Sequence, residues 1–243
     1  MSAPRLYLLD VEGTVAPISF VYDRLIPYSR KHLRFFLAEK YDDAGVQDDL
    51  ALLVEENRAD SEAPRISAAG GGKPIEWNAF RDECLRYLRW LMDRDRKSTA
   101  LKSLQGKVWK EGFASDELKG ELFADVPEAL KRWSKAARVA IYSSASVEAQ
   151  QMLFRHSVHG DLTPSIAGYF DTRTGGKKEC ASYAAVAGAM GVAAKVGLFF
   201  SDAVRELDAA REAGFQTRLV MRPGNAAVAD AHGHVIIGGL DGI

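Results

Sequence analysis

LYLLDVEGTVAPISF, residues 6–20, is the stretch that decides the fold, because a short apolar run in it ends at an acid. Residues 6–9 are apolar and β-compatible, which is the pattern of a strand buried on both faces. Asp10 follows at once, and Glu12 comes two residues later. In open α/β sheets ligands bind beyond the carboxyl ends of the strands, so an acid placed there is a candidate for chemistry. The alternative is an Asx turn that only leads the chain out of the strand.

The composition limits the class of protein. The chain has 243 residues, of which 47% are hydrophobic, so it can bury a sizeable core as one large domain or a domain with an insertion. Its net charge of -1 provides no general attraction to nucleic acid or to an anionic membrane. The two cysteines, Cys84 and Cys180, suit a reducing compartment, and no apolar run is long enough for a signal peptide or a membrane span. We therefore expect a cytoplasmic protein.

Two different sequence patterns divide the chain. Residues 27–123 have helical periodicity and many charges, interrupted by a loop at 61–74 that is rich in glycine and proline. From residue 124 onward, short apolar runs alternate with helix-like segments, and this rhythm predicts parallel strands joined by right-handed crossovers. The predicted fold is α/β, with a doubly wound and mainly parallel sheet. Residues 1–17 and 124–243 would form this core, and residues 18–123 would form an inserted helical cap.

Polar residues also end two later apolar runs. The run 139–142 stops at Ser143 and Ser144, and the run 196–200 stops at a serine followed by Asp202. Because parallel strands deliver their carboxyl ends to one edge of a sheet, we expect these side chains close to those that follow the first strand.

Lys177 lies between these two runs, after a pair of glycines and before a helix-like segment. Together with Asp10, Asp202 and the hydroxyls, it would form a site for a metal-bound phosphate, since Mg²⁺ needs few protein oxygens. The Asp10 carboxylate could attack phosphorus to form an aspartyl-phosphate, while the lysine neutralises the phosphate. Taken singly, the same residues could instead be helix caps, a turn residue and a solvated lysine.

Several stretches together resemble one family, the enolase-phosphatases of methionine salvage in the haloacid dehalogenase superfamily. An acid-x-acid-Gly-Thr motif alone would indicate only the superfamily, but the resemblance runs from Asp10 to Ala226 and includes the helical insert. The stretches are DVEGTVAPISFVYDRLIPYSR (10–30), DRKSTALKSLQGKVW (95–109), FADVPEAL (123–130), IYSSASVEAQQMLFRHS (141–157), GYFDTRTGGKKECASY (168–183) and MRPGNA (221–226).

The resemblance implies a role for each of six residues. Asp10 would be the nucleophile and a metal ligand, and Glu12 would bind the metal through its backbone carbonyl and protonate the leaving group with its side chain. Ser143 and Ser144 would bind the substrate. Lys177 would contact the phosphate and take part in catalysis, and Asp202 would be the second acidic metal ligand. Most of the superfamily has Asp where Glu12 stands, but Glu is what the enolase-phosphatases show. Lys178 stands where an apolar residue is usual, so either lysine could face the phosphate, and we favour Lys177. Ala145 and Ser201 replace an expected Gly and Thr.

The resemblance also implies the reaction and the cofactor, Mg²⁺. The substrate would be 2,3-diketo-5-methylthiopentyl-1-phosphate, which is first enolised and then dephosphorylated to 1,2-dihydroxy-3-keto-5-methylthiopentene. Glu12 and Lys177 are the nearest candidates for the base that removes the proton. The cap would exclude water and contact the methylthio end. Its segment 93–99, DRDRKST, is a candidate for that contact, and a charged helix face is the alternative.

Three other functions are compatible with parts of this pattern. One is a phosphatase of the same fold that acts on another small phosphate ester. The second is a haloacid dehalogenase, which would not need Mg²⁺, and the third is a non-enzymatic member that uses the insert to bind a protein. We expect a monomer whose partner is the small phosphorylated substrate, with no nucleic acid and no membrane.

Overall fold

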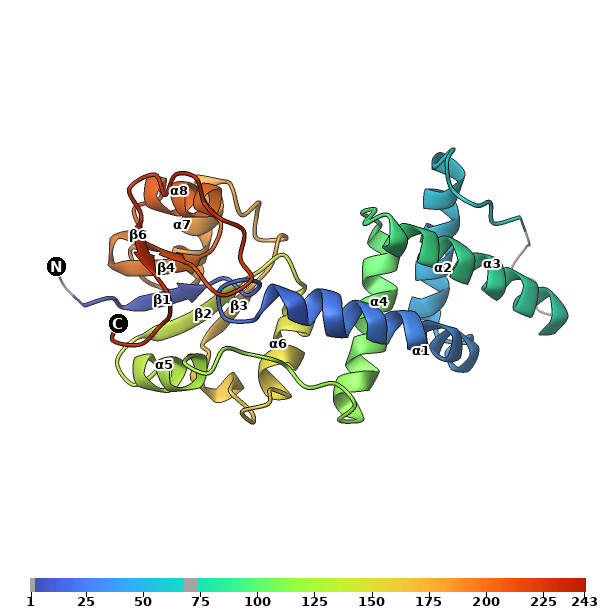
Figure 1. Ribbon diagram of the computed structural model, residues 1–243, viewed down its shortest axis with the longest axis horizontal. Helices are drawn as coiled ribbons and strands as arrows, with labels where there is room; N and C mark the ends of the chain where they lie inside the picture. The colour runs from blue at the N-terminus through green and yellow to red at the C-terminus, as the bar shows by residue number, and fades with distance from the viewer. Residues whose placement is uncertain (1–2, 68–73) are drawn as a thin grey trace. The chain divides into compact units, whose positions relative to one another are not determined.

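The computed structural model describes residues 3–67 and 74–243 (Figure 1). The chain forms two compact units, one of residues 1–20 and 118–243 and the other of residues 21–117. The predicted cap, 18–123, thus begins three residues before the second unit and ends six residues after it. Whether these units act as separate domains stays a prediction.

The first unit is built on a parallel sheet of six strands in the order β3-β2-β1-β4-β5-β6. The strands are β1 (Leu6–Leu9), β2 (Arg138–Tyr142), β3 (Gly168–Phe170), β4 (Gly197–Ser201), β5 (Gln216–Val220) and β6 (Val235–Ile237). In β1, Leu9 pairs with Ile141 on one side and with Phe200 on the other. The chain leaves β1 toward β2 and β3 and then returns to β4, so the topological switch point lies between β1 and β4. The predicted strand at residues 6–9 is therefore confirmed, and it adjoins the switch point.

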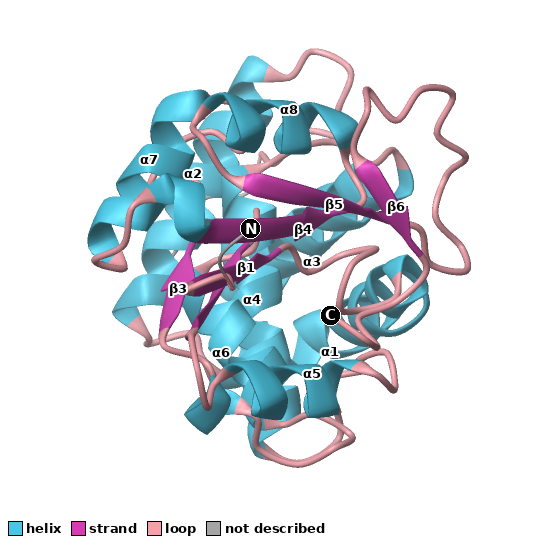
Figure 2. Ribbon diagram, turned by 90° about the vertical axis from the view of Figure 1, so that its left-hand side faces the viewer, coloured by secondary structure: helices cyan, strands magenta, loops and turns pink. Residues whose placement is uncertain are grey.

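Helices cover both faces of this sheet, as the doubly wound prediction requires (Figure 2). Helices α5 (Val126–Trp133) and α6 (Val147–Arg155) lie on one face, and α7 (Cys180–Ala189) and α8 (Val204–Glu212) lie on the other. Short 3-10 turns occupy Thr163–Ser165 and Ala194–Val196. On the first face, the rings of Tyr7 and Trp133 stack with centroids 4.3 Å apart. On the second, Tyr183 packs among the buried residues of β1, β2 and β4.

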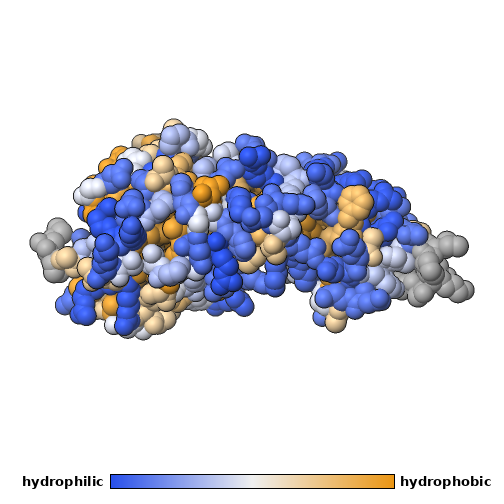
Figure 3. All heavy atoms as spheres, turned by 90° about the horizontal axis from the view of Figure 1, so that it is seen from below, coloured by the Kyte–Doolittle hydropathy of each residue, from blue (hydrophilic) through white to orange (hydrophobic). Residues whose placement is uncertain are grey.

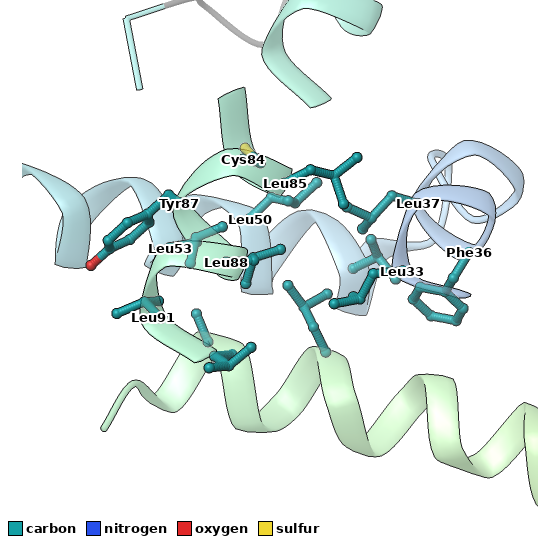
Figure 4. Close-up of a cluster of buried hydrophobic side chains, with 14 of the residues drawn as sticks. Leu33, Phe36, Leu37, Leu50, Leu53, Cys84, Leu85, Tyr87, Leu88 and Leu91 are labelled. Carbon is teal, nitrogen blue, oxygen red and sulfur yellow. The ribbon is translucent and has the colours of Figure 1, made fainter. Parts of the chain in front are cut away.

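The second unit is a helical bundle. A π-helical turn, Phe20–Leu25, leads from the first unit into α1 (Ile26–Glu39), which is followed by α2 (Ala44–Ala59), α3 (Pro74–Asp93) and α4 (Thr99–Ala114). These helices bury a leucine-rich cluster that includes Leu33, Leu50 and Leu88 (Figure 4). The carboxylate of Asp43 caps α2 by accepting from the Val46 amide at 2.9 Å. This bundle would be the predicted helical cap.

The structure bears on two predicted segments of this unit, 61–74 and 93–99. The loop predicted at 61–74 follows α2 as expected, but its residues 68–73 lie outside the described residues. The segment 93–99 is not a charged helix face, so that alternative is wrong. It ends α3 at Asp93, turns through Asp95 at a φ of 48°, and starts α4, whose N-cap is Ser98. The charges therefore belong to a loop between two helices.

The space-filling view (Figure 3) shows the character of one face of the surface. On the face seen in Figure 3, hydrophilic residues predominate and hydrophobic residues form small separate patches. Among the described helices, none combines the length and apolar character that a membrane span needs.

Candidate active site

The loop that follows β1 holds Asp10 at the carboxyl end of the sheet. Asp10 is 4% exposed, and its amide donates to the carbonyl of Phe200 at 3.0 Å, so the first residue beyond β1 is still tied to β4. Gly13 turns the chain at a φ of +72°, and a side chain there would collide with the Asp202 carboxylate. The motif thus needs glycine both for its backbone conformation and for the close approach of an acid.

Residues after β5 fix this loop from the other side. The Asn225 amide donates to the carbonyl of Gly13 at 2.9 Å, and the Arg222 guanidinium donates to the carbonyl of Thr14 at 3.0 Å. Arg222 is itself buried and ion-paired with Asp125 at 2.9 Å. The segment 221–226 therefore holds the loop after β1 in position, a role that the sequence pattern alone does not indicate.

Lys177 reaches the same place from the loop before α7. Its ammonium nitrogen lies 2.5 Å from Oδ1 of Asp10 and 2.8 Å from Oε2 of Glu206. Burial would lower the pKa of Lys177, but the two carboxylates outweigh burial and raise it, so the side chain is a cation at neutral pH. Lys178, the alternative lysine, is exposed. The geometry therefore brings Lys177 to Asp10.

The loop that carries Lys177 is held by hydroxyl groups beneath it. The Tyr183 hydroxyl donates to the carbonyl of Lys177 at 2.6 Å, and Tyr142 donates to that of Gly175 at 2.7 Å. Ser182 donates to the carbonyl of Gly176 at 2.8 Å. Because both tyrosines are fully buried, this loop is fixed to the core of the sheet.

Glu206 is a site residue that the sequence analysis missed. Its Oε2 lies 3.0 Å from the Ser201 hydroxyl, which lies 3.1 Å from Oδ2 of Asp10. Burial and the charge of Asp10 raise the pKa of Glu206 to about 7, although Lys177 opposes the shift. The available signal was its position four residues after Asp202, which places it in the first turn of α8, the helix that follows β4.

Of the two predicted serines, the structure brings Ser143 to the site. Ser143 is fully buried, and its hydroxyl donates to Oε2 of Glu12 at 3.4 Å and accepts from the Ala145 amide at 3.1 Å. Ser144 is exposed in the same loop. Neither serine is the cap of α6, because Ser146 accepts from the Ala149 amide at 3.2 Å. The helix-cap alternative for these two residues is therefore wrong.

Glu12 and Asp202 complete the acidic cluster. Burial, together with the charge of Asp10, raises the pKa of Glu12. The same two causes raise the pKa of Asp202 to about 6. With Asp10 and Glu206, the site gathers carboxylates around Lys177, and this excess of negative charge disfavours ionisation of Glu12, Asp202 and Glu206.

The donor set fits a hard divalent cation. Asp10 and Asp202 supply carboxylate oxygens, and Oδ1 of Asn225 is buried beside Asp202 with no hydrogen-bond partner in the described part of the chain. The described residues contain no group of three or more His, Cys, Asp or Glu side chains that could hold a metal ion. Mg²⁺ does not require such a group, because it keeps several waters and takes one or two carboxylates.

Comparison with known proteins shows the family. A sequence model of the haloacid dehalogenase-like hydrolases matches residues 4–214, and the chain belongs to that family. Within it, the chain is a member of the group named Enolase-phosphatase E1. It is 50% identical over 222 residues to the protein of that name from Synechococcus elongatus, a match that covers 91% of this chain and 90% of that one.

Two further relatives are informative. A Sorghum bicolor protein is named probable bifunctional methylthioribulose-1-phosphate dehydratase/enolase-phosphatase E1, and it is 41% identical over 236 residues, covering 94% of this chain and 45% of that protein. The crystal structure of the UTR4 protein from Saccharomyces cerevisiae matches with a TM-score of 0.77 and 33% identity, covering 99% of this chain and 100% of that one. Members of this family generally use a divalent metal, and a small phosphorylated substrate fits them.

Proposed function

We propose that this protein is an Mg²⁺-dependent enolase-phosphatase of methionine salvage. It converts 2,3-diketo-5-methylthiopentyl-1-phosphate to 1,2-dihydroxy-3-keto-5-methylthiopentene and phosphate. The observation that carries the proposal is the 50% identity to an Enolase-phosphatase E1 across 91% of the chain, a span that must include residues of both units. The Sorghum relative supports the substrate, because its name joins this activity to a dehydratase acting on a methylthio sugar phosphate.

The dephosphorylation step uses Asp10 as the nucleophile. The Asp10 carboxylate attacks phosphorus, the bond from phosphorus to the leaving oxygen breaks, and that oxygen takes a proton from Glu12. Water then attacks phosphorus of the aspartyl-phosphate and gives a proton to the Glu12 carboxylate, and the bond from phosphorus to Asp10 breaks, which returns free Asp10 and phosphate. Lys177 neutralises the phosphoryl oxygens, and Ser143 and Ser144 donate hydrogen bonds to them. The buried ion pair between Lys177 and Asp10 supports this assignment, because it places a cation beside the attacking oxygen atoms.

Enolisation precedes that step. A base removes a proton α to a carbonyl of the diketone, and the electrons move onto the carbonyl oxygen. Of the two candidates, Glu12 is favoured, because the ammonium of Lys177 is already engaged by Asp10 and Glu206. Mg²⁺ held by Asp10, the Glu12 carbonyl and Asp202 would supply an electrophile for developing negative charge. A monomeric state, a cytoplasmic location and the lack of nucleic-acid or membrane partners stay predictions.

Mass spectrometry of the products tests the function. The full chain is incubated with the diketo phosphate and Mg²⁺, and we expect the dephosphorylated enediol together with one equivalent of phosphate. A chelator should stop the reaction, which separates a phosphatase from a metal-independent dehalogenase. Cleavage of generic phosphate esters with no turnover of the diketo phosphate would indicate a same-fold phosphatase for another substrate. No turnover of any phosphate ester would support the non-enzymatic alternative.

A further inference from the structure

The helical unit contains a cavity beside the loop that joins α3 to α4. Its volume is about 430 Å³, within the usual range for small-molecule sites, and it lies where the end of α2, α3 and the start of α4 meet. Its walls include the ring of Tyr87, the side chain of Leu91 and the polar loop from Arg96 to Ser98. All lining residues belong to the second unit, so the cavity is a feature of the bundle itself.

Tyr87 presents an unused hydrogen-bond donor to this cavity. The residue is 2% exposed, and its hydroxyl oxygen points away from the leucine cluster on which its ring packs (Figure 4). No side chain or backbone group among the described residues accepts a hydrogen bond from this hydroxyl or donates one to it. Burial, followed by the charges of Asp60 and Glu56, raises the pKa of Tyr87, so the hydroxyl keeps its proton at neutral pH. The hydroxyl is therefore available to donate a hydrogen bond to a ligand or to water in the cavity.

Two lysines on the lining are also available. Lys97 and Lys102 are exposed, and neither forms an ion pair within residues 3–67 and 74–243. Arg96 differs, because it pairs with Asp60 at 3.1 Å and with Glu62 at 3.6 Å. The free positive charge at the cavity is therefore that of the two lysines.

The acidic residues of the lining are already satisfied. Glu56 accepts from the Ser98 hydroxyl at 2.5 Å and from the amides of Thr99 and Ala100, so it caps the N-terminus of α4. Asp60 is neutralised by Arg96. Glu56 keeps its negative charge, because its hydrogen bonds come from neutral groups. The lining still has three basic side chains, Arg96, Lys97 and Lys102, against the two carboxylates of Glu56 and Asp60, and this balance favours an anion.

We propose that this cavity binds a small organic oxyanion, a phosphate or a carboxylate, held by Lys97, Lys102 and the Tyr87 hydroxyl. The organic part would pack against Leu91 and the Tyr87 ring. The lining residues belong to the second unit, whereas the residues of the cluster around Asp10 belong to the first.

Amide NMR tests the proposal with inorganic phosphate and acetate as probes at constant ionic strength. Backbone amides of 96–102 report on the cavity, and those of 143–147 report separately on phosphate bound at the cluster around Asp10. Saturable shifts of the 96–102 amides are expected, and the stronger of the two probes identifies the anion class. The Lys97→Met/Lys102→Met double variant should weaken this binding by at least about tenfold, and Tyr87→Phe should weaken it by about tenfold. The double variant Lys31→Met/Lys195→Met removes two exposed charges elsewhere and should leave the affinity unchanged.

Three outcomes would overturn the proposal. In the first, the 96–102 amides do not move with either probe while the 143–147 amides do, which would confine anion binding to the catalytic cluster. In the second, the shifts persist unchanged in Lys97→Met/Lys102→Met. In the third, the control variant Lys31→Met/Lys195→Met weakens binding as much as Lys97→Met/Lys102→Met does, which would show a general effect of net charge. None of these results depends on turnover, so they would leave the proposed enzymatic function untouched.

Discussion

The ammonium nitrogen of Lys177 lies 2.5 Å from Oδ1 of Asp10, although 167 positions separate the two residues in the chain. Asp10 leaves β1 beside the topological switch point, and Lys177 arrives in a loop fixed by Tyr183 and Ser182. A buried pair of this kind is costly unless each charge keeps its partner. We therefore expect the properties of the site to depend strongly on Lys177.

The first prediction compares the two adjacent lysines. Lys177→Ala should lower kcat at least about tenfold more than Lys178→Ala, because removing a donor aimed at developing charge commonly costs 2 to 4 kcal/mol. Lys178 is exposed, so its removal leaves the site intact. Steady-state kinetics with the diketo phosphate decides the matter, and circular dichroism checks folding. Equal losses would contradict the role assigned to Lys177, and the reverse order would transfer that role to Lys178.

The second prediction concerns Glu206 as a positioning residue. Glu206→Gln keeps the size of the side chain but removes the second carboxylate at Lys177, and a loss of about 10- to 100-fold in kcat is expected for such an outer partner. Glu212→Gln, an exposed change at the end of the same helix, is the matched control. A structural role alone would lower the melting temperature and leave kcat of the folded fraction unchanged. That result would contradict the positioning role.

The third prediction concerns the metal. Asp202→Ala should lose most of the Mg²⁺ affinity and nearly all turnover while the protein stays folded, because a site with few protein ligands depends on each carboxylate. Calorimetric titration of Mg²⁺ gives the affinity. Wild-type affinity in this variant would remove Asp202 from the set of ligands.

The fourth prediction concerns stability and pH, at a site remote from the metal. The His234 side chain is fully buried, and its ring bonds to Thr217 at 2.7 Å and to Asp208 at 3.1 Å. Burial lowers the pKa of His234 below its usual 6.5, although Asp208 opposes the shift and Arg211 adds to it. Below pH 6.5 the unfolded chain therefore binds more protons than the folded one, so His234 makes stability fall as the pH falls.

The measurement is the melting temperature between pH 7.5 and pH 5.5. Over this range the melting temperature of the wild type should fall by more than that of His234→Gln. The comparison holds whatever the absolute stability of the variant. Parallel curves for the two proteins would show that His234 does not titrate differently in the folded state.

The pattern of the sequence predicts the central part of the fold well. Leu6–Leu9 lies in the middle of the sheet with both faces covered, so a continuous apolar run is its physical signature. Gly168–Phe170 and Val235–Ile237 are the two edge strands, each three residues long; the first is partly buried, and the second is exposed at Val235 and Ile236. Runs this short carry no periodicity, so nothing in the local sequence marks them as strands.

The same distinction applies to the site. Asp10, Ser143 and Asp202 could be predicted because each follows a strand, and the topology then brings them to one edge. Glu206 and Asn225 act through contacts that form only when helix α8 and the loop after β5 are packed. Ser144 was predicted with Ser143 because the pair ends an apolar run and matches the family's substrate-binding serines. Its side chain is exposed, and its contact with the substrate stays a prediction.

The central claim is that Asp10 is the nucleophile of the phosphatase step, and Asp10→Asn tests it most directly. An amide cannot form the aspartyl-phosphate, whereas enolisation needs a base and a bound carbonyl that this change leaves in place. Absorbance of the conjugated enol and release of free phosphate are followed in one cuvette at saturating Mg²⁺, with the diketo phosphate as substrate. The account predicts that enol phosphate accumulates while phosphate release stays near background. Phosphate release close to the wild-type rate would contradict it.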